Sequence, residues 1–296
     1  MDYVYSVLIL IGIYVVLAAS FNLIIGRAGL ASIAHPIFFG LGAYTAALLA
    51  IHFGLNAVIA TLAGGALAAA FSLMISLPSL RVSGDYLMIT SIGFQLGVLQ
   101  IIKNIEITGS QGGLSNIPTP IAGPGRGWMF SVIALGTAAA TVLLIRWIVR
   151  GPYGRAINAM RDDELAFIAL GRDATRIKIA IFAVGCGLAG IAGGIYAFYF
   201  QYLTPEQYEI LASGTMLTMV VVGGMGSTWG PVVGALLLVA LPQLITFLQL
   251  PPSYMAPVQG MIFTLLVILF LFVKPQGLVS PEPPAPLTRR TPARRP

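Results

Sequence analysis

Long apolar runs alternate with short polar interruptions along most of the chain. Nine such runs can be followed, at roughly 4–25, 36–51, 55–77, 85–102, 128–149, 179–201, 211–223, 230–249 and 256–273. Most of them approach the roughly 20 residues that a helix needs to cross the hydrocarbon core of a bilayer, whereas the second and seventh are shorter. This pattern predicts an all-α fold, a polytopic transmembrane bundle of about 8–10 helices with one or two broken or re-entrant segments.

Composition supports the same class. Hydrophobic residues make up 57% of the 296 positions and charged residues only 9%, against about a quarter charged in soluble domains. The first apolar run follows Met1 and Asp2 without a basic region, so we expect a retained span and not a cleaved signal. The single cysteine, Cys186, lies in an apolar run, so a disulfide framework is excluded.

Basic residues are distributed unevenly among the polar interruptions. If the interruption at 150–178 is cytoplasmic, the loops with Arg27 and Arg81, the link near 223–230 and the C-terminal tail are cytoplasmic too. That side then holds 14 of the 16 basic residues, and the other side holds only Lys103 and Arg126. The positive-inside rule therefore predicts this orientation, with the N-terminus outside after nine crossings. It also explains the net charge of +6 without a nucleic-acid partner.

The interruption at 150–178 has the pattern of two short helices. Apolar residues in its first half recur at i, i+3, i+4 and i+7, which places them on one helical face: Tyr153, Ala156, Ile157 and Met160. The other face is polar and carries Arg155, Asn158 and Arg161.

The second half of this interruption carries helix start and stop signals. Asp162 or Asp163 can cap the next helix, Glu164 suits its positive start, and Gly171 can end it. A narrow apolar face is expected there, formed by Leu165, Ile168 and Ala169. Such a ridge fits a groove on a soluble partner; the alternative is a solvated amphipathic connector without a partner.

Two glycine- and proline-rich stretches predict broken helices. The first runs from Arg27 to Pro36, and its closest internal echo is 226–234. Unwound backbone persists in a membrane only where protein or a water-filled cavity covers it. Paired interruptions of this kind are typical of a midplane transport pathway, although chance similarity is an alternative in glycine-rich sequence. Other glycines predict close helix packing: Gly64, Gly65, Gly187, Gly190, Gly193 and Gly194.

Polar residues within the spans are candidates for a translocation path. We select Ser32, His35 and Tyr44 near the first break, and Asp85, Thr90 and Gln95 in the fourth run. The alternative is hydrogen bonding between helices. A metal site at His35 is not expected, because His52 lies on the far side of a span, and a helix-end hydrogen bond is the preferred interpretation.

Five separated elements resemble the permeases of branched-chain amino acid ABC importers. The first lies in the 150–178 interruption and comprises Gly154, Arg155, Ala156, Arg161, Glu164, Leu165, Ala166 and Gly171. The second comprises Gly29, Ser32, His35, Phe38, Gly40, Gly42, Ala43 and Tyr44. The third is the external connection 108–118, which would pack over the outer mouth or meet a substrate-binding protein; the alternative is an ordinary flexible linker. The fourth is a glycine-rich signature, with Gly223, Gly224, Gly226, Ser227, Gly230 and Pro231. The fifth is the ending Lys274-Pro275-Gln276-Gly277-Leu278.

The resemblance implies a bacterial inner-membrane permease that carries no catalytic site and binds no cofactor. Its expected partners are a second related permease, two cytoplasmic ATPases that bind ATP and Mg, an external substrate-binding protein and membrane lipid. Coupling to the ATPases would fall to Gly154, Arg155, Ala156, Arg161, Glu164, Ala166 and Gly171. No G-x-x-x-x-G-K-[ST] motif occurs in the chain. We expect a permease domain at 1–278 and a disordered cytoplasmic tail at 279–296.

Other functions remain as alternatives. Relatives that carry urea, amides or other amino acids share these motifs. An ion-coupled secondary transporter would need titratable groups within the spans, and only Asp85 comes near. A membrane-embedded enzyme would need clustered His, Asp or Glu at the surface, and only the run 162–164 offers acidic residues in series.

Overall fold

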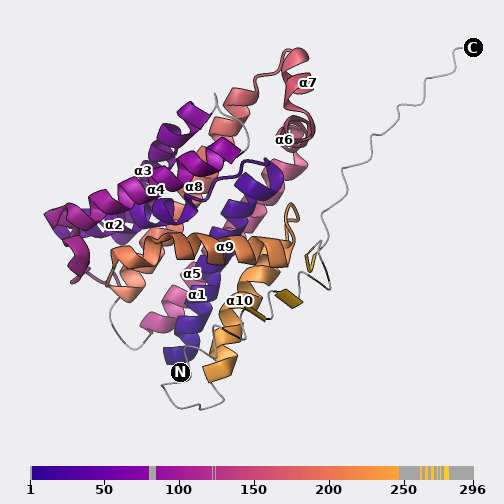
Figure 1. Cartoon of the computed structure of the whole chain (residues 1–296). Helices are drawn as coiled ribbons and strands as arrows, with labels where there is room; N and C mark the ends of the chain where they lie inside the picture. The colour runs from indigo at the N-terminus through magenta and orange to yellow at the C-terminus, as the bar shows by residue number, and fades with distance from the viewer. Residues whose placement is uncertain are drawn as a thin grey trace, which may run out of the picture.

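The protein is a bundle of tilted helices in the computed structural model (Figure 1). The structure describes residues 2–79, 85–121, 123, 125–246, 261, 264, 265, 268, 269, 272, 274 and 277–279. Its α-helices are α1 (Asp2–Phe21), α2 (His35–Phe53), α3 (Ala57–Ser79), α4 (Asp85–Asn104), α5 (Arg126–Arg150), α6 (Pro152–Asp162), α7 (Glu164–Ala169), α8 (Ala174–Phe200), α9 (Ile210–Gly223) and α10 (Gly230–Thr246). A π-helical stretch, η1 (Asn22–Arg27), extends α1. Short 3-10 helices are η2 (Glu106–Thr108), η3 (Ser110–Gly112) and η4 (Pro205–Tyr208).

Eight of the nine predicted apolar runs correspond in order to helices. Six described helices are long and apolar enough to cross a membrane: Tyr3–Arg27, His35–Phe53, Ala57–Met74, Tyr86–Asn104, Arg126–Arg150 and Ala174–Phe200. The predicted all-α class is therefore confirmed. The seventh run forms α9, which is short as expected, whereas the second forms a helix of 19 residues. The ninth run and the tail lie largely outside the described residues; the six residues described between 261 and 272 are helical.

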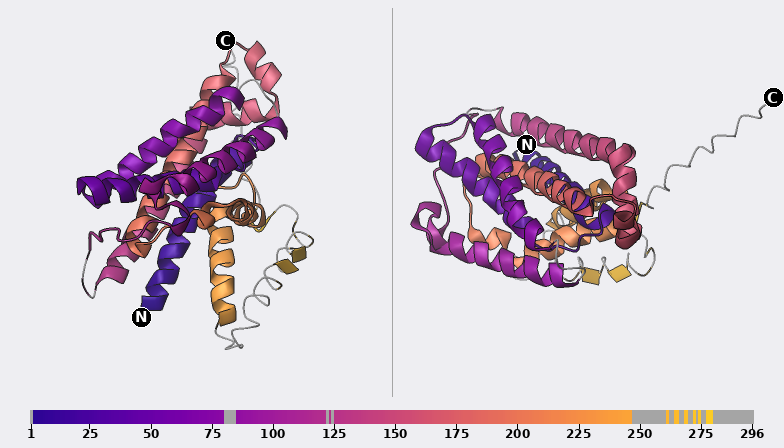
Figure 2. Two further views of the ribbon diagram at one scale, coloured as in Figure 1. Left: turned by 60° about the vertical axis from the view of Figure 1, so that its left-hand side comes forward. Right: turned by 90° about the horizontal axis from the view of Figure 1, so that it is seen from above.

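Central and peripheral helices differ in how far the protein itself covers them. The apolar windows of α1, α2 and α8 are 72%, 61% and 56% buried, against 28% each for α3, α4 and α5. The two further views show α8 and α1 inside the ring of the other helices (Figure 2). The outer faces of α3, α4 and α5 are therefore left to lipid or to another subunit.

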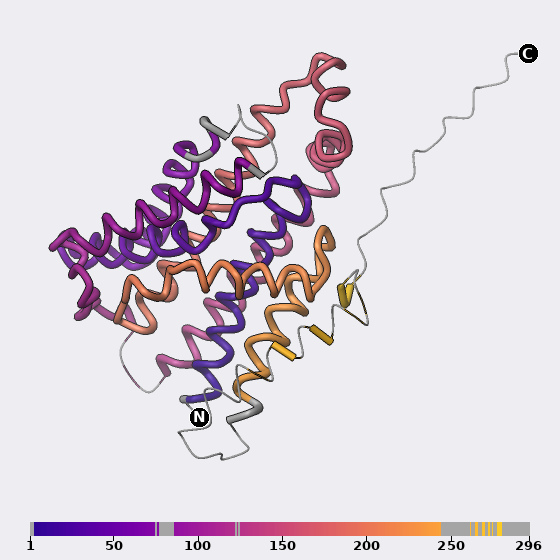
Figure 3. The backbone as a smooth tube through the Cα atoms, viewed as in Figure 1, coloured from indigo at the N-terminus to yellow at the C-terminus, as the bar shows by residue number. Residues whose placement is uncertain are grey.

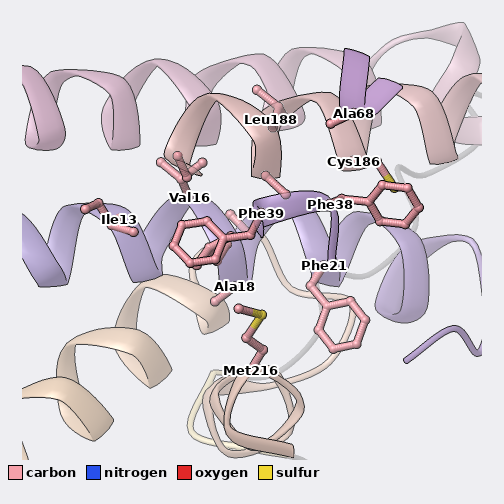
Figure 4. Close-up of a cluster of buried hydrophobic side chains, with 14 of the residues drawn as sticks. Ile13, Val16, Ala18, Phe21, Phe38, Phe39, Ala68, Cys186, Leu188 and Met216 are labelled. Atoms are coloured by element: carbon pink, nitrogen blue, oxygen red, sulfur yellow. The ribbon is translucent and has the colours of Figure 1, made fainter. Parts of the chain in front are cut away.

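A hydrophobic core joins α1, α2, α3, α8 and α9 (Figure 4). Its side chains come from helices that are far apart in sequence: Ile13, Val16, Phe21, Phe38, Phe39, Ala68, Cys186, Leu188 and Met216. Cys186 is fully buried in this cluster and serves as a small apolar residue.

Glycines allow α2, α3 and α8 to meet backbone against backbone. A methyl group on Gly42 would lie 2.2 Å from the carbonyl oxygen of Gly190, and one on Gly64 would lie 2.5 Å from that of Gly42. On Gly193 it would lie 2.1 Å from the carbonyl oxygen of Phe39. The predicted packing role is thus confirmed for Gly64, Gly190 and Gly193, since any larger residue would push the helices apart.

The predicted break between the first two spans is also present. The chain leaves η1 at Arg27 and runs without helical structure through 29–34 before α2 begins, a path that the backbone tube shows clearly (Figure 3). Ala28, Ser32 and Ala34 are buried in this stretch. Ala31 and Ile33 are partly buried and Gly29 is exposed, so the protein covers most of the unwound backbone and leaves Gly29 open.

Candidate functional site: the 150–178 loop and the glycine junction

The 150–178 segment forms the two predicted short helices, α6 and α7, at one end of the bundle (Figure 1). Asp163 caps α7, since its Oδ1 accepts a hydrogen bond from the Ala166 amide at 2.9 Å. Gly171, with a φ of +74°, follows the end of α7 in a left-handed conformation that suits glycine. Glu164 forms an ion pair with Lys178 at 2.5 Å and thereby ties α7 to α8.

The apolar face of α6 is only partly as predicted. Ile157 and Met160 are buried against the bundle, whereas Tyr153 is 63% exposed. Tyr153 lies in the first turn of α6, where the helix leaves α5, so its ring stays outside the packed face. On α7 only Phe167 is buried. The adjoining apolar side chains, Leu165, Ile168 and Leu170, stand exposed and form what we call the α7 ridge.

Arg161 connects this loop to the membrane helices. Its Nη1 donates a hydrogen bond to the carbonyl oxygen of Gly26, in η1, at 2.5 Å. The same side chain passes Gly29 and Gly226, since methyl groups there would lie 3.2 Å from its Cγ and 3.6 Å from its Nη1. Arg161 was predicted on the polar face of α6; the sequence did not indicate what it contacts.

Two segments hydrogen-bond to each other next to Arg161, namely residues 22–28 and 223–230. We call these two segments the glycine junction. The Asn22 side chain donates to the carbonyl oxygen of Ser227 and accepts from the amide of Gly226, both at 2.8 Å. Arg27 Nη2 donates to Thr228 Oγ1 at 3.2 Å. Arg27 and Thr228 thus join the two interrupted segments at the end of the bundle that carries α6. The midplane pathway inferred from their similarity stays a prediction.

The predicted glycine-rich signature folds as a tight link between α9 and α10. Ser227 Oγ donates to the carbonyl oxygen of Gly224 at 3.0 Å and accepts from the Gly230 amide at 2.8 Å. Gly223 approaches α10 closely, because a methyl group there would lie 2.0 Å from the carbonyl oxygen of Gly230. Pro231 follows in the first turn of α10 and is buried.

The ending that includes Gly277 and Leu278 packs onto the same junction. The Leu278 amide donates to the carbonyl oxygen of Val222 at 2.9 Å, and the Val279 amide donates to that of Gly223 at 3.0 Å. A methyl group on Gly224 would lie 2.1 Å from the carbonyl oxygen of Val279. Residues 277–279 therefore lie at the α6 end of the molecule.

The candidate path residues do not all point inward. Ser32, His35, Tyr44 and Gln95 are buried. Thr90 is exposed on α4, where its hydroxyl donates to the carbonyl oxygen of Tyr86 within the helix. Asp85 begins α4, and its side chain lies outside the described part of the chain.

His35 makes the helix-end hydrogen bond that the sequence favoured. Its Nε2 lies 2.9 Å from the hydroxyl oxygen of Ser20, and its ring stacks on Phe21 with centroids 5.0 Å apart. Both partners belong to α1, so His35 fixes the start of α2 against the first helix. Among the described residues, no group of three or more His, Cys, Asp or Glu could hold a metal ion.

Tyr44 belongs to a buried aromatic cluster at the outer side of α2. Its ring lies 5.9 Å from that of Tyr208, which lies 5.4 Å from Phe39. Gly40 makes room for Tyr208, because a methyl group would lie 2.9 Å from that ring. The hydroxyl oxygens of Tyr44 and Tyr208 are buried and have no hydrogen-bond partner within the described residues. Buried polar atoms of this kind are rare.

Gln95 joins the same cluster through the backbone. Its Nε2 donates to the carbonyl oxygen of Tyr208 at 3.1 Å, and its Oε1 accepts from the Ser213 hydroxyl at 3.1 Å. Burial raises the pKa of the Tyr208 hydroxyl well above its usual value, which keeps the phenol protonated. The sequence analysis did not select Tyr208, because this residue lies in a polar link. The feature that could have indicated it is an aromatic side chain between two spans.

The connection 108–118 packs on the link between α8 and η4. Leu114 and Leu203 exchange backbone hydrogen bonds of 2.8 and 3.0 Å, and Gln201 Nε2 donates to the carbonyl oxygen of Ile117 at 2.9 Å. Ile117 is buried. The flexible-linker alternative is therefore wrong for this stretch. Lys103 lies at the same end and pairs with Glu209 at 2.8 Å.

Membrane-length helices, with an amphipathic loop hydrogen-bonded beside the break between the first two spans, define a polytopic helical membrane protein. The chain belongs to the family described as branched-chain amino acid transport system / permease component, whose model matches residues 3–271.

Several characterised relatives carry the same description. The chain is 32% identical to the high-affinity branched-chain amino acid transport system permease protein LivM of Escherichia coli, over 94% of this chain and 68% of that protein. It is 26% identical to the probable LivM of Methanocaldococcus jannaschii, over 95% and 94% of the two chains. Similarity to the Escherichia coli permease LivH is 27% identity over 51% of this chain and 47% of LivH. No solved structure matches the chain significantly.

Proposed function

We propose that the chain is the permease subunit of an ATP-driven importer of branched-chain amino acids, in which separate subunits hydrolyse ATP. The family and the LivM relatives support the transport role and the substrate class. The lack of a G-x-x-x-x-G-K-[ST] motif supports the assignment of ATP and Mg to partners.

The hydrogen bond from Arg161 to Gly26 is the observation that carries the coupling role of 150–178. In this proposal the ATPases hold the α7 ridge, since its exposed leucines and isoleucine suit a groove on a soluble partner. Movement of α7 passes through α6 to Arg161, and from there to the glycine junction between α1, α9 and α10. Force thus reaches the two breaks in the bundle directly.

The other predicted coupling residues determine how α6 and α7 pack against the bundle and against each other. Gly154 lets α6 turn back on α5, because a methyl group there would lie 1.7 Å from the carbonyl oxygen of Val149. Glu164 anchors α7 to α8 through Lys178. Arg155 and Ala156 line the groove between α6 and α7, and Ala166 donates to the Asp163 cap.

The proposed orientation places α6 and α7 in the cytoplasm of a bacterial cell. Arg27, Arg161 and residues 277–279 lie at the α6 end, while Lys103 and Arg126 lie near the opposite links of α4 and α5. This arrangement supports the charge asymmetry expected of cytoplasmic loops. The packed connection 108–118 then faces an external binding protein.

The exposed face of α4 is the proposed contact for a second permease. Gly93 and Gly97 lie one turn apart, and methyl groups on either would meet nothing within 4 Å. A small-residue pair at i, i+4 allows close approach of another membrane helix. Thr90 lies on the same exposed part of α4, so it would reach a path formed between the two permeases.

A reconstituted complex tests the coupling role. Glu164→Gln removes the ion pair to Lys178, and Gly171→Ala strains the left-handed residue that follows α7. Both should insert normally yet hydrolyse ATP with uptake reduced by roughly tenfold or more, since a loss of about 1.4 kcal/mol in coupling is a factor of ten. Arg176→Gln, which removes a solvent-exposed pair with Asp173, is the matched control. Unchanged uptake in the first two variants would remove the coupling assignment.

A further inference from the structure

A lateral groove opens between α5, α6 and α8, beside the base of the 150–178 loop. It has a volume of about 720 Å³, within the range of ligand-binding clefts. Leu23 of η1 and Ile181 and Val184 of α8 form part of its floor. No described residue of α7 lines it, so this groove is separate from the α7 ridge.

The groove is apolar below and positively charged at its rim. Arg146 and Arg150 both line it and lie one turn apart on α5. Among the described residues neither guanidinium pairs with an acidic side chain. Like charges at this spacing repel each other, so an anion between them would be stabilised.

The start of α6 adds a third positive feature at the rim. Gly151 and Pro152 line the groove where α6 begins, and no described side chain caps this helix start. Pro152 carries no N–H, and the amides of Gly151 and Gly154 donate to the carbonyl oxygens of Trp147 and Gly151, so it is the helix dipole that favours an anion there. Two exposed aromatic residues, Trp147 and Tyr153, also line the groove. Such residues are enriched at the boundary between lipid and water.

The position of the groove decides what kind of molecule occupies it. α5 is a peripheral helix whose membrane-length segment ends at Arg150. Leu143 and Trp147 are exposed on its outer side, so the groove opens sideways toward the acyl chains. A soluble anion would leave the apolar floor uncovered, and a soluble protein would meet α7 first. A molecule with an apolar tail and an anionic head matches both the apolar floor and the positively charged rim of the groove.

We propose that this groove binds one anionic phospholipid, with the headgroup phosphate on Arg146 and Arg150 and an acyl chain along Leu23 and Val184. The lipid then lies between the three helices that join the loop to the bundle, and its presence stiffens the base of the coupling loop. The inference rests on the membrane placement of α5; the identity of the transported solute does not affect it.

Lipid retention by the purified full chain tests the proposal. Native mass spectrometry in detergent would compare phosphatidylglycerol with phosphatidylethanolamine, titrated separately. We expect tighter binding of phosphatidylglycerol, and in R146Q/R150Q a loss of roughly fivefold per arginine, about 25-fold in all, since each basic side chain near a membrane surface contributes about 1 kcal/mol. The matched control, R172Q/R176Q, removes the same charge outside the groove and should bind as the unchanged protein does.

A second variant tests the apolar floor of the groove, and its result does not depend on the arginine variant R146Q/R150Q. Ala180→Trp fills the groove and leaves both arginines in place; it should lower phosphatidylglycerol binding while the circular dichroism spectrum stays helical. Inorganic phosphate should not displace the lipid, because it lacks the acyl chain. The proposal would be overturned if the two lipids bound equally, or if R172Q/R176Q lost as much lipid binding as R146Q/R150Q. It would also be overturned if Ala180→Trp bound lipid fully, or if the groove cross-linked to an ATPase. None of these outcomes depends on uptake, so they are distinguishable from failure of the proposed function.

Discussion

Arg161, in the last turn of α6, hydrogen-bonds the carbonyl oxygen of Gly26, although the two residues are 135 positions apart in the chain. The acceptor lies in a π-helical turn, where the regular i to i−4 pattern is already disturbed. A loop on the surface is thereby bonded to an irregular turn at the end of a membrane-length helix. This link gives the loop a direct mechanical route into the bundle.

Arg161→Ala should therefore separate ATP hydrolysis from transport. Hydrogen bonds that involve a charged group contribute about 1.5–3 kcal/mol, so we expect uptake to fall by at least tenfold while ATPase activity persists. Reconstituted complexes in proteoliposomes allow both rates to be measured on one preparation. Arg161→Lys should recover little, because the shorter lysine side chain lacks the planar guanidinium whose Nη1 reaches the carbonyl oxygen of Gly26.

The matched control for this experiment is Arg176→Ala. Arg176 belongs to the same basic segment, but it is solvent-exposed and pairs only with Asp173 within the described residues. Its loss should change uptake by less than about twofold, as is usual for surface ion pairs. If both variants lose transport equally, the effect comes from loop charge and the Arg161 link has no special role.

Tyr44→Phe and Tyr208→Phe test the buried hydroxyls. Each removes a phenolic oxygen without a described partner, and loss of an unsatisfied buried polar group leaves stability unchanged or raises it. If these hydroxyls serve the solute, the KM for uptake should rise severalfold while the melting temperature does not fall. A fall in stability with unchanged KM would assign them a purely structural role.

Local features of the 150–178 loop could be predicted because they depend on neighbouring residues. Asp163 caps α7 and Gly171 follows its end, as the sequence indicated, since caps are set within a few positions. The break at 29–34 was also predictable, because glycine and proline density disfavours helix locally. Likewise, glycine runs in α3 and α8 indicated close packing before any partner was known.

Contacts between distant segments could not be predicted in the same way. Asn22 lies within an apolar run, and nothing near it in the sequence indicates that its side chain hydrogen-bonds residues 226 and 227. Tyr208 lies in a polar link and becomes buried only because Gly40 leaves room for its ring. Thr90 looked inward-facing from its helix alone, but the packing of α4 turns it outward. Rotation of a helix about its axis depends on all its neighbours.

A leucine at both Gly93 and Gly97 should prevent a second permease from packing on α4. Both positions are open in the described chain, so the isolated subunit should tolerate the change. At a close helix–helix contact the added side chains would hold the backbones apart. Copurification with a tagged partner permease measures the loss. Gly136→Leu is the control, since Gly136 is equally open but lies on α5. Full copurification of the double variant would exclude α4 from the contact.

Because α2 packs closely on α8, a single methyl group added between them should lower the stability of the fold. In Gly42→Ala the new methyl would lie 2.2–2.5 Å from three backbone atoms of Gly190, which cannot rotate away. Overpacking of this kind costs about 1–3 kcal/mol, so the melting temperature in detergent should fall by roughly 2–12 °C. Gly136→Ala adds the same methyl to open space on α5 and should be neutral or slightly stabilising, because alanine favours helix over glycine by about 0.5–1 kcal/mol. Equal melting temperatures for the two variants would mean that α2 and α8 are not in backbone contact, and the bundle would then need a different arrangement of its central helices.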